Sequence, residues 1–380
     1  MTPRNRKPHL LIVSMQALGG GAEKQSALVA EALKQAFDIT LVVLKPVADH
    51  WRRAMERKGF KVVALQKRDT FLERRWRDHR LLKVCISLKP DLVYSRWIKL
   101  NIALAKGREH GLLTSGLIIQ VASTLTKSLA SNRLNQFLFG RKIQRYYPKA
   151  DLIICNGNIA RKDLIDEFGV PSDKCVYLPN LLGEDDFHVG FKENTRQGQD
   201  TPLRIVCVGR LGPRKDYMTL IKAVARVREK VDLRIEIFGV GPHRKKLERA
   251  IASSHLNGMV TLKGFVPKPS KYFRDFDLLV SCSMCEGMSN VMLEAMAAGL
   301  PVVVTNVSGS QDVIENSSQG IIFPPGDVDS LSHILQSLAT DRQKLALLSR
   351  EGRSRAADFV VSELSNRYQE VFRSVLATRQ

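Results

Sequence analysis

The sequence predicts an α/β protein with two domains, each built on a parallel sheet. The chain has 380 residues, which corresponds to two or three domains at about 150 residues each. Short apolar runs alternate with helical stretches along the chain, which is typical of βαβ units. The alternation breaks at residues 183–202, which are polar, contain glycine and show no periodicity. That segment predicts a linker.

The apolar runs predict two sets of six strands. They are continuous rather than alternating, as expected of parallel strands that are buried on both faces. Helical stretches such as 22–37 and 76–88 lie between them, and the chain ends in helices from Val328 onward. The predicted strands are 9–14, 39–44, 61–65, 91–95, 116–121 and 151–156 before the linker, and 203–208, 234–238, 259–263, 277–281, 301–305 and 320–323 after it.

The charge is unevenly distributed. The chain holds 59 Lys+Arg and 38 Asp+Glu, a formal net charge of +21. Residues 1–150 hold 29 and 10 of these (29 − 10 = +19), and residues 151–380 hold 30 and 28 (30 − 28 = +2). Such one-sided charge suggests a polyanionic partner for the first part of the chain, either nucleic acid or an anionic membrane surface.

Composition excludes several classes of protein. Hydrophobic residues make up 44% and charged residues 26%, so the chain is not of the disordered type. The six cysteines show no disulfide framework, which favours a reducing, cytoplasmic location. No apolar stretch approaches the ~18 residues that cross a bilayer.

Residues 277–305 are the most informative segment. A strand leads into a polar loop, and a helix is expected to begin near Asn290 and to end before Pro301. Glu286 and Glu294 could hold a polyol by its hydroxyl groups, and the backbone N–H groups of Ser289, Asn290 and Val291 at the helix start suit a phosphate. Polyol and phosphate together describe a nucleotide sugar. The residues alone also allow a solvated Glu286 and a Glu294 that complements the helix dipole.

Two further loops follow predicted strands. In 206–217 (VCVGRLGPRKDY), Arg210 and Lys215 flank a loop before a helix whose N-cap is Asp216. Two cations there suit a diphosphate, although a solvated basic loop has the same composition. In 14–24 (SMQALGGGAEK), Gly20 and Gly21 would let the backbone approach a ligand closely, or would simply form a turn.

These three segments resemble one family. E-G-x-S-N-x-x-x-E-A-x-A-x-G-x-P-V-V, from Glu286 onward, is similar to the signature of family 4 retaining glycosyltransferases with the GT-B fold. G-R-L-x-x-x-K-D and G-G-A-E-K resemble two more of its motifs. The resemblance implies that Glu286 contacts hydroxyls of the donor sugar, Glu294 the ribose, and Arg210 and Lys215 the diphosphate. The other implied donor contacts are Gly20, Gly21, Ser289, Asn290, Val291 and Val266, the last in a loop beside the base.

The resemblance also implies an architecture and an activity. Residues 1–182 would form a Rossmann-like acceptor domain, completed by a helix at about 354–380, and 203–353 a donor domain facing it across a cleft. The enzyme would be retaining and metal-independent, with no cofactor beyond the nucleotide sugar as co-substrate. It would move a hexose or N-acetylhexosamine, from a UDP-sugar rather than a GDP-sugar, to a glycolipid or polysaccharide in envelope, exopolysaccharide or lipopolysaccharide biosynthesis.

One expected residue is missing. Many family members have a histidine after the fifth strand, but residues 118–123 read IIQVAS, so Gln120, Ser123 or Thr124 occupies that region. The predicted catalytic residues are therefore Glu286, Arg210 and Lys215. In the front-face mechanism proposed for the family, the leaving phosphate accepts the acceptor proton and the protein supplies position and charge.

Two other patterns suggest metal sites and are interpreted as structural. Cys282-x-x-Cys285 stands alone, whereas structural zinc needs about four ligands. The D-x-D patterns at 275–277 and 327–329 precede a strand and a helix respectively. No metal is predicted.

The basic segment 52–89 gives the predicted membrane contact. Arg74, Arg75, Trp76 and Arg77 combine cations with an aromatic ring, which suits the interface of an anionic bilayer, although a solvated helix is also compatible. The enzyme would be peripheral at the inner face of the cytoplasmic membrane. Alternatives are another GT-B enzyme (an epimerase or phosphorylase) and a non-catalytic nucleic-acid-binding protein, for which no reader motif is present.

Overall fold

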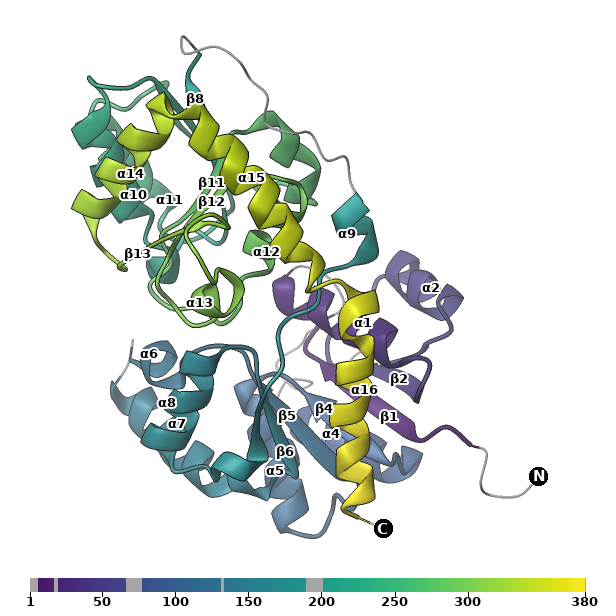
Figure 1. The fold of residues 1–380 in the computed structure, drawn as a ribbon. Helices are drawn as coiled ribbons and strands as arrows, with labels where there is room; N and C mark the ends of the chain where they lie inside the picture. Colours follow the sequence, from purple (N-terminus) through teal and green to yellow (C-terminus); the bar gives the residue numbers. More distant parts are fainter. Residues whose placement is uncertain (1–5, 17–19, 66–76, 131–132, 189–200, 380) are drawn as a thin grey trace. The chain divides into compact units, whose positions relative to one another are not determined.

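The chain forms two compact units, shown in the computed structural model of Figure 1. The structure describes residues 6–16, 20–65, 77–130, 133–188 and 201–379, without the side chains of 77 and 133–135. Unit 1 comprises Met1–Leu181 and Val361–Gln380, and unit 2 comprises Leu182–Val360. The predicted linker was 183–202 and the predicted return of the chain began at about 354. In the structure, helix α9 (Glu184–His188) lies in that segment, and the return begins at Val361.

Unit 1 contains a seven-stranded parallel sheet in the order β3-β2-β1-β4-β5-β6-β7. Its strands form where the sequence has continuous apolar runs, and every residue of β1, β4 and β5 is buried. The order reverses between β1 and β4, where Ile12 pairs with Leu41 on one side and Tyr94 on the other. The strands are β1 (His9–Ser14), β2 (Asp38–Val43), β3 (Lys61–Ala64), β4 (Leu92–Ser95), β5 (Gly116–Val121), β6 (Leu152–Cys155) and β7 (Cys175–Tyr177).

Two helical layers cover this sheet. One buries residues such as Leu81, Leu104 and Leu164, and the other buries Phe37 and Phe372. The first layer is α4 (Arg77–Leu88), α5 (Ile98–Glu109), α6 (Leu125–Leu129), α7 (Arg133–Tyr146) and α8 (Asn158–Phe168). The second is α1 (Gly21–Leu33), α2 (Asp49–Arg57) and α16 (Val361–Ala377), the yellow helix that lies along the sheet in Figure 1.

Unit 2 contains a six-stranded parallel sheet in the order β10-β9-β8-β11-β12-β13. The strands are β8 (Leu203–Val208), β9 (Leu233–Phe238), β10 (Val260–Gly264), β11 (Leu278–Ser281), β12 (Val302–Thr305) and β13 (Ile321–Phe323). Besides α9, the helices are α10 (Tyr217–Val227), α11 (Arg244–Ser253), α12 (Asn290–Ala297), α13 (Ser310–Val313), α14 (Val328–Thr340) and α15 (Arg342–Ala357). Two parallel α/β sheets confirm the predicted fold class.

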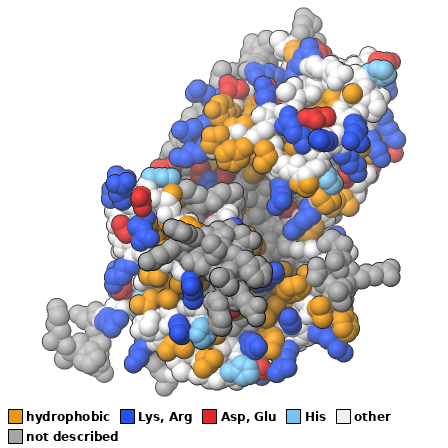
Figure 2. Space-filling model, turned by 180° about the vertical axis from the view of Figure 1, so that it is seen from behind, with side chains coloured by type: hydrophobic (Ala, Val, Ile, Leu, Met, Phe, Trp, Pro, Cys, Tyr) orange, Lys and Arg blue, Asp and Glu red, His pale blue; other side chains and the backbone are white. Residues whose placement is uncertain are grey.

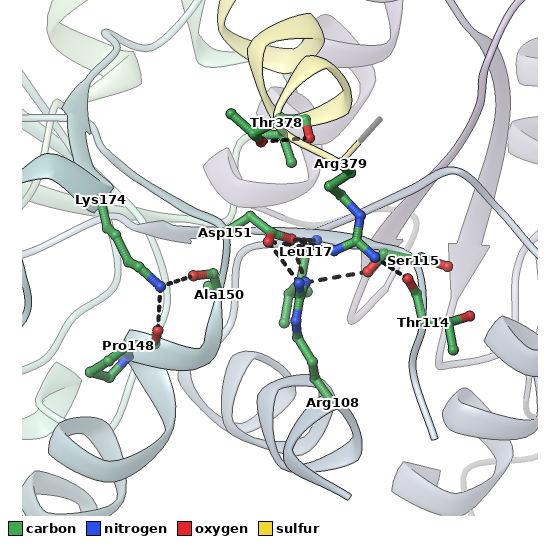
Figure 3. Close-up of polar contacts among 11 residues, drawn as sticks. Arg108, Thr114, Ser115, Leu117, Pro148, Ala150, Asp151, Lys174, Thr378 and Arg379 are labelled. Atoms are coloured by element: carbon green, nitrogen blue, oxygen red, sulfur yellow. Dashed lines mark hydrogen bonds and ion pairs between the residues drawn. The ribbon is translucent and has the colours of Figure 1, made fainter. Parts of the chain in front are cut away.

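Polar contacts join the end of α16 to the amino edge of the first sheet (Figure 3). Asp151 accepts hydrogen bonds from the backbone N–H of Leu117 at 2.7 Å and from Nη2 of Arg108 at 2.7 Å. Arg379, which follows α16, adds a contact from Nη1 to Oδ2 of Asp151 at 3.4 Å. A single carboxylate thus links the last helix to two internal strands.

None of the helices in the described ranges combines the length and the apolar character that a membrane span requires.

Candidate functional site

Four loops meet at the carboxyl edge of the second sheet. They follow β8, β9, β11 and β12, and glycines allow their backbones to touch. A Cβ on Gly239 would lie 1.9 Å from the carbonyl oxygen of Gly209, and one on Gly309 would lie 2.6 Å from Cα of Met288. The backbone N–H of Met284 also donates to the carbonyl of Arg214 at 2.8 Å. The loops therefore form one connected surface, and this is the edge of an α/β sheet at which ligands bind.

Lys215 and Glu286 form an ion pair across two of these loops. Lys215 ends a short 3₁₀ turn (Pro213–Lys215) after β8, and Glu286 lies between β11 and α12. Each side chain is about one-fifth exposed, 19% and 21%, so the pair is accessible from solvent but partly shielded. Two residues predicted to contact different parts of one donor thus lie side by side.

Arg210 is the second predicted cation of this edge. It is exposed, and within the described part of the chain its guanidinium forms no hydrogen bond or ion pair. Arg214 behaves differently, since its Nη2 donates to the carbonyl of Cys285 at 3.3 Å. Arg210 is therefore available to an anion, whereas Arg214 helps to join the loops.

Tyr217 lies beneath the ion pair at the start of α10. Its hydroxyl donates to the carbonyl of Gly209 at 3.2 Å. Burial, together with nearby Cys207 and Glu286, raises the pKa of Tyr217 well above its usual value, so the phenol stays neutral. No role was predicted for Tyr217, and in the structure its hydroxyl holds the backbone of the loop that follows β8.

Helix α12 begins at the predicted position. Ser289 is its N-cap and its Oγ accepts from the backbone N–H of Met292 at 3.4 Å. Ser289, Asn290 and Val291 are half-buried at this helix start, and Glu294 is buried, with 7% of its surface exposed. The helix start and Glu286 thus belong to the same loop surface.

Two apolar side chains at this edge were not predicted. Phe265 follows β10 and is 69% exposed, and Val240 follows β9 and is 54% exposed, while the predicted contact Val266 is half-buried. Exposed apolar groups that follow neighbouring strands offer a surface for an aromatic base. Each of the two stands two positions after a predicted strand, and that position was the available signal in the sequence.

The predicted glycines lie in unit 1. Gly20 and Gly21 are exposed at the start of α1, where Gly20 is the N-cap. A Cβ on Gly20 would lie 2.7 Å from Oε2 of Glu23, so a larger residue would displace that carboxylate.

Glu23 provides a test of this loop. Burial raises its pKa, although a backbone hydrogen bond and nearby Arg96 oppose the shift, and among the described residues its Oε1 has no hydrogen-bond partner. A raised folded pKa means that stability is full below the unfolded pKa and is lost as pH rises through the folded pKa. Glu23→Gln is therefore expected to melt at a higher temperature than the unaltered protein at about pH 8, with the difference shrinking toward about pH 4.

Thermal melts over that pH range measure the effect. Glu363→Gln, an exposed change on α16, is the control and should shift Tm little. A Glu23→Gln variant that melts lower at every pH would show that the ionised carboxylate stabilises the fold.

The region of the missing histidine is mostly inward-facing. Gln120 is buried in β5 and accepts from the hydroxyl of Tyr94, so it does not reach the edge of the sheet. Thr124 is buried, and only Ser123 is partly exposed. Of the three residues considered there, Ser123 is the one that can meet a ligand.

Arg74, Arg75 and Trp76 lie outside the described residues, and Arg77 is described only as the first residue of α4.

The patterns suggestive of metal sites have structural surroundings. Cys282 and Cys285 are buried and not joined in a disulfide, and burial raises the pKa of Cys282. Asp277 accepts from the backbone N–H of Arg204 at 2.9 Å, and Asp327 caps α14 through the N–H of Ser330. The described residues contain no group of three His, Cys, Asp or Glu that could hold a metal ion.

The two parallel sheets and this strand-end site define a glycosyltransferase with the GT-B fold. Two family models match the chain, Glycosyltransferase Family 4 over residues 19–182 and Glycosyl transferases group 1 over residues 191–355. The chain belongs to the family 4, group 1 glycosyltransferases, and it is a glycosyltransferase enzyme.

Curated relatives and solved structures are similar over most of the chain. N-acetylgalactosamine-N,N'-diacetylbacillosaminyl-diphospho-undecaprenol 4-alpha-N-acetylgalactosaminyltransferase of Campylobacter jejuni is 28% identical over 73% of this chain and 74% of its own length. The putative colanic acid biosynthesis glycosyltransferase WcaL of Escherichia coli is 24% identical over 75% and 70%. Anabaena HepE in complex with UDP and glucose matches with a TM-score of 0.78 at 19% identity, covering 97% of this chain and 100% of that one.

Proposed function

We propose that the protein is a retaining, metal-independent glycosyltransferase that uses a UDP-sugar. It transfers a hexose or N-acetylhexosamine to a glycolipid or polysaccharide acceptor at the inner face of the cytoplasmic membrane, in envelope, exopolysaccharide or lipopolysaccharide biosynthesis. The observation that carries the proposal is the loop surface of unit 2, where Lys215 pairs with Glu286 and where Arg210, among the residues that the structure describes, forms no hydrogen bond or ion pair.

The charges of this surface fit the expected leaving group. A nucleoside diphosphate departs with negative charge, and Arg210 and Lys215 supply two cations at the strand end. The start of α12 adds backbone N–H groups with a partial positive charge. Glu286, beside Lys215, can accept hydrogen bonds from sugar hydroxyls, and Glu294 can do so for a ribose.

The reaction needs no nucleophile from the protein. The acceptor oxygen forms a bond to the anomeric carbon as the bond from that carbon to the diphosphate breaks. The acceptor proton passes to the departing phosphate oxygen on the same face. The protein then contributes orientation and charge stabilisation.

The choice of donor and acceptor draws on the relatives. HepE has been captured with UDP and glucose, which favours a UDP-sugar. The Campylobacter relative is named for an acceptor linked to undecaprenol diphosphate, and WcaL for colanic acid biosynthesis. Both names favour a lipid-linked or polysaccharide acceptor, which also suits the positive charge of residues 1–150.

A donor screen tests the proposal. UDP- and GDP-sugars are mixed with lipid-linked acceptors, products are identified by mass, and the anomeric configuration is determined by NMR. Transfer in the presence of EDTA, with the configuration retained, is expected. Inversion of the anomeric configuration or a requirement for metal would contradict the proposal. So would a rise in melting temperature with RNA, steeply dependent on salt, and none with any nucleotide sugar.

Glu294→Ala is expected to lower the affinity for the UDP-sugar about 10- to 100-fold, because hydrogen bonds to a charged group contribute about 1.5–3 kcal/mol. Titration calorimetry measures the affinity, and the melting temperature of the free variant shows whether it is folded. Glu229→Ala, at a carboxylate with 83% of its side chain exposed, is the control in the same unit. Unchanged affinity in Glu294→Ala would remove Glu294 from the donor site.

A further inference from the structure

The large hydrophobic side chains that are exposed in the described part of unit 1 lie on one of its two helical layers. Among its described residues, the six large hydrophobic side chains that are exposed all belong to helices α4–α8 or to the turns after them. The layer of α1, α2 and α16 on the other face contributes none of them. The six are Ile86, Leu88, Leu112, Phe137, Leu138 and Ile159.

Two of these side chains are adjacent on α7. Phe137 is 56% exposed and Leu138 is 45% exposed, while Ile143 and Tyr146 on the same helix are buried against the sheet. Ile143 and Tyr146 thus attach α7 to the core of unit 1, and Phe137 and Leu138 are not part of that core.

Cations surround this apolar pair. Arg141 and Lys142 lie one turn further along the helix and are exposed, and the guanidinium of Arg141 is 4.6 Å from the ring centre of Phe137. Arg145 follows on the same face and pairs with Glu109 of α5 at 3.2 Å. The sequence of α7 contains four Lys or Arg and no Asp or Glu. We call Phe137, Leu138, Arg141, Lys142 and Arg145 the α7 surface.

The first half of α7 lies near the ligand edge of the first sheet, whereas Arg145 lies toward the amino edge, beside Glu109 at the end of α5. Helix α7 packs against α6, which follows β5, and against α8, which follows β6. Ile159, another exposed apolar residue, is in the first turn of α8. Figure 2 is seen from the side opposite to α16, and on the part of unit 1 that it shows, basic and hydrophobic side chains are intermixed and acidic ones are few.

We propose that the α7 surface docks on an anionic lipid bilayer, an inference that rests on the proposed use of a membrane-linked acceptor. Phe137 and Leu138 enter the interface while Arg141 and Lys142 meet lipid phosphates, the arrangement by which amphipathic helices bind anionic membranes. A soluble polyanion would use the cations but would leave both apolar side chains in water. This surface is distinct in sequence from the segment 74–77, and its apolar pair lies on the half of α7 nearer the ligand edge of unit 1.

Vesicle sedimentation of the full-length protein tests the proposal. The vesicles are phosphatidylcholine alone or with about 30% phosphatidylglycerol, at low and moderate salt. The variants are Phe137→Ser/Leu138→Ser and Arg141→Gln/Lys142→Gln. The control, Lys34→Gln/Arg373→Gln, removes the same charge from the end of α1 and from α16 on the opposite layer.

The unaltered protein and the control are expected to bind the anionic vesicles, and each α7 variant to bind at least about tenfold more weakly. Equal binding by the α7 variants would overturn the proposal. So would loss of binding in the charge variant with no change in the apolar one, the result expected of a polyanion site. If a variant melts at a lower temperature, hydrogen exchange of the unaltered protein is measured with and without anionic vesicles. Vesicles are expected to protect the α7 amides from exchange, and absence of that protection overturns the proposal.

The proposed function is measured separately. Protection by a UDP-sugar in thermal melts without vesicles reports on unit 2. Its absence would contradict the donor assignment, whereas vesicle binding by α7 would still be decided by the variants above.

Discussion

Lys215→Met is expected to lower the turnover number about 100- to 1000-fold, the range seen when one preorganised group that stabilises transition-state charge is removed. Lys215 is paired with Glu286, so its ammonium is held at the strand end. Methionine keeps much of the side-chain volume and removes only the charge. Release of nucleoside diphosphate from the donor, with acceptor present, measures the rate.

A lysine of the same unit provides the matched control. Lys222 is exposed on α10, and Lys222→Met should keep full activity. The double variant Lys215→Met/Glu286→Gln separates two roles. If Lys215 acts only by holding Glu286, the double variant will be no slower than Glu286→Gln alone. If Lys215 stabilises the leaving diphosphate directly, the double variant will be slower than either single one. A turnover within threefold of normal in Lys215→Met would refute both roles.

The strands and the loops that follow them were predictable because each depends on a local signal. Continuous apolar runs identified twelve of the thirteen strands in the described ranges to within one residue at each end, since parallel strands buried on both faces need such runs. The start of α12 was predicted from its polar loop, and Ser289 indeed caps it. The missed strand β7 has three residues, two of them only half-buried, and so gave no such signal.

Elements held by distant contacts were not predictable. Helix α9 has five residues and lies in the predicted linker. Arg353 of α15 fixes it, because its guanidinium lies 4.5 Å from the ring centre of Phe187 and donates to the carbonyl of that residue at 3.2 Å. Arg355 likewise extends α15 within unit 2 by donating to the carbonyl of Val313 at 2.8 Å. The chain therefore returns to unit 1 at Val361, seven residues later than the predicted 354.

The same distinction applies to the candidate site. Each of Arg210, Lys215, Glu286 and Glu294 was identified from its own motif. The ion pair between Lys215 and Glu286 joins residues 71 positions apart and depends on the order of β8 and β11 in the sheet. Position 309 needs glycine because a Cβ there would clash with the backbone of Met288, which lies in another loop. No pattern near Gly309 in the sequence could therefore predict this requirement.

Phe372→Ala is expected to destabilise unit 1 by about 3–5 kcal/mol, the cost of removing a large buried ring and leaving a cavity. Phe372 belongs to α16 and is fully buried. Its ring centre lies 5.3 Å from that of Tyr94 in β4 and 6.3 Å from that of Phe37. Because residues 361–380 are separated in sequence from the rest of unit 1, the substitution tests whether that unit needs the returning helix.

Tryptophan fluorescence during urea unfolding measures this effect selectively. All three tryptophans, at positions 51, 76 and 97, belong to unit 1, so the signal follows that unit even if the two units unfold separately. Arg373→Ala, an exposed change at the next position, is the control and should stay within about 0.5 kcal/mol of the unaltered protein. If Phe372→Ala leaves the tryptophan transition where it was, α16 does not complete the core of unit 1 in solution.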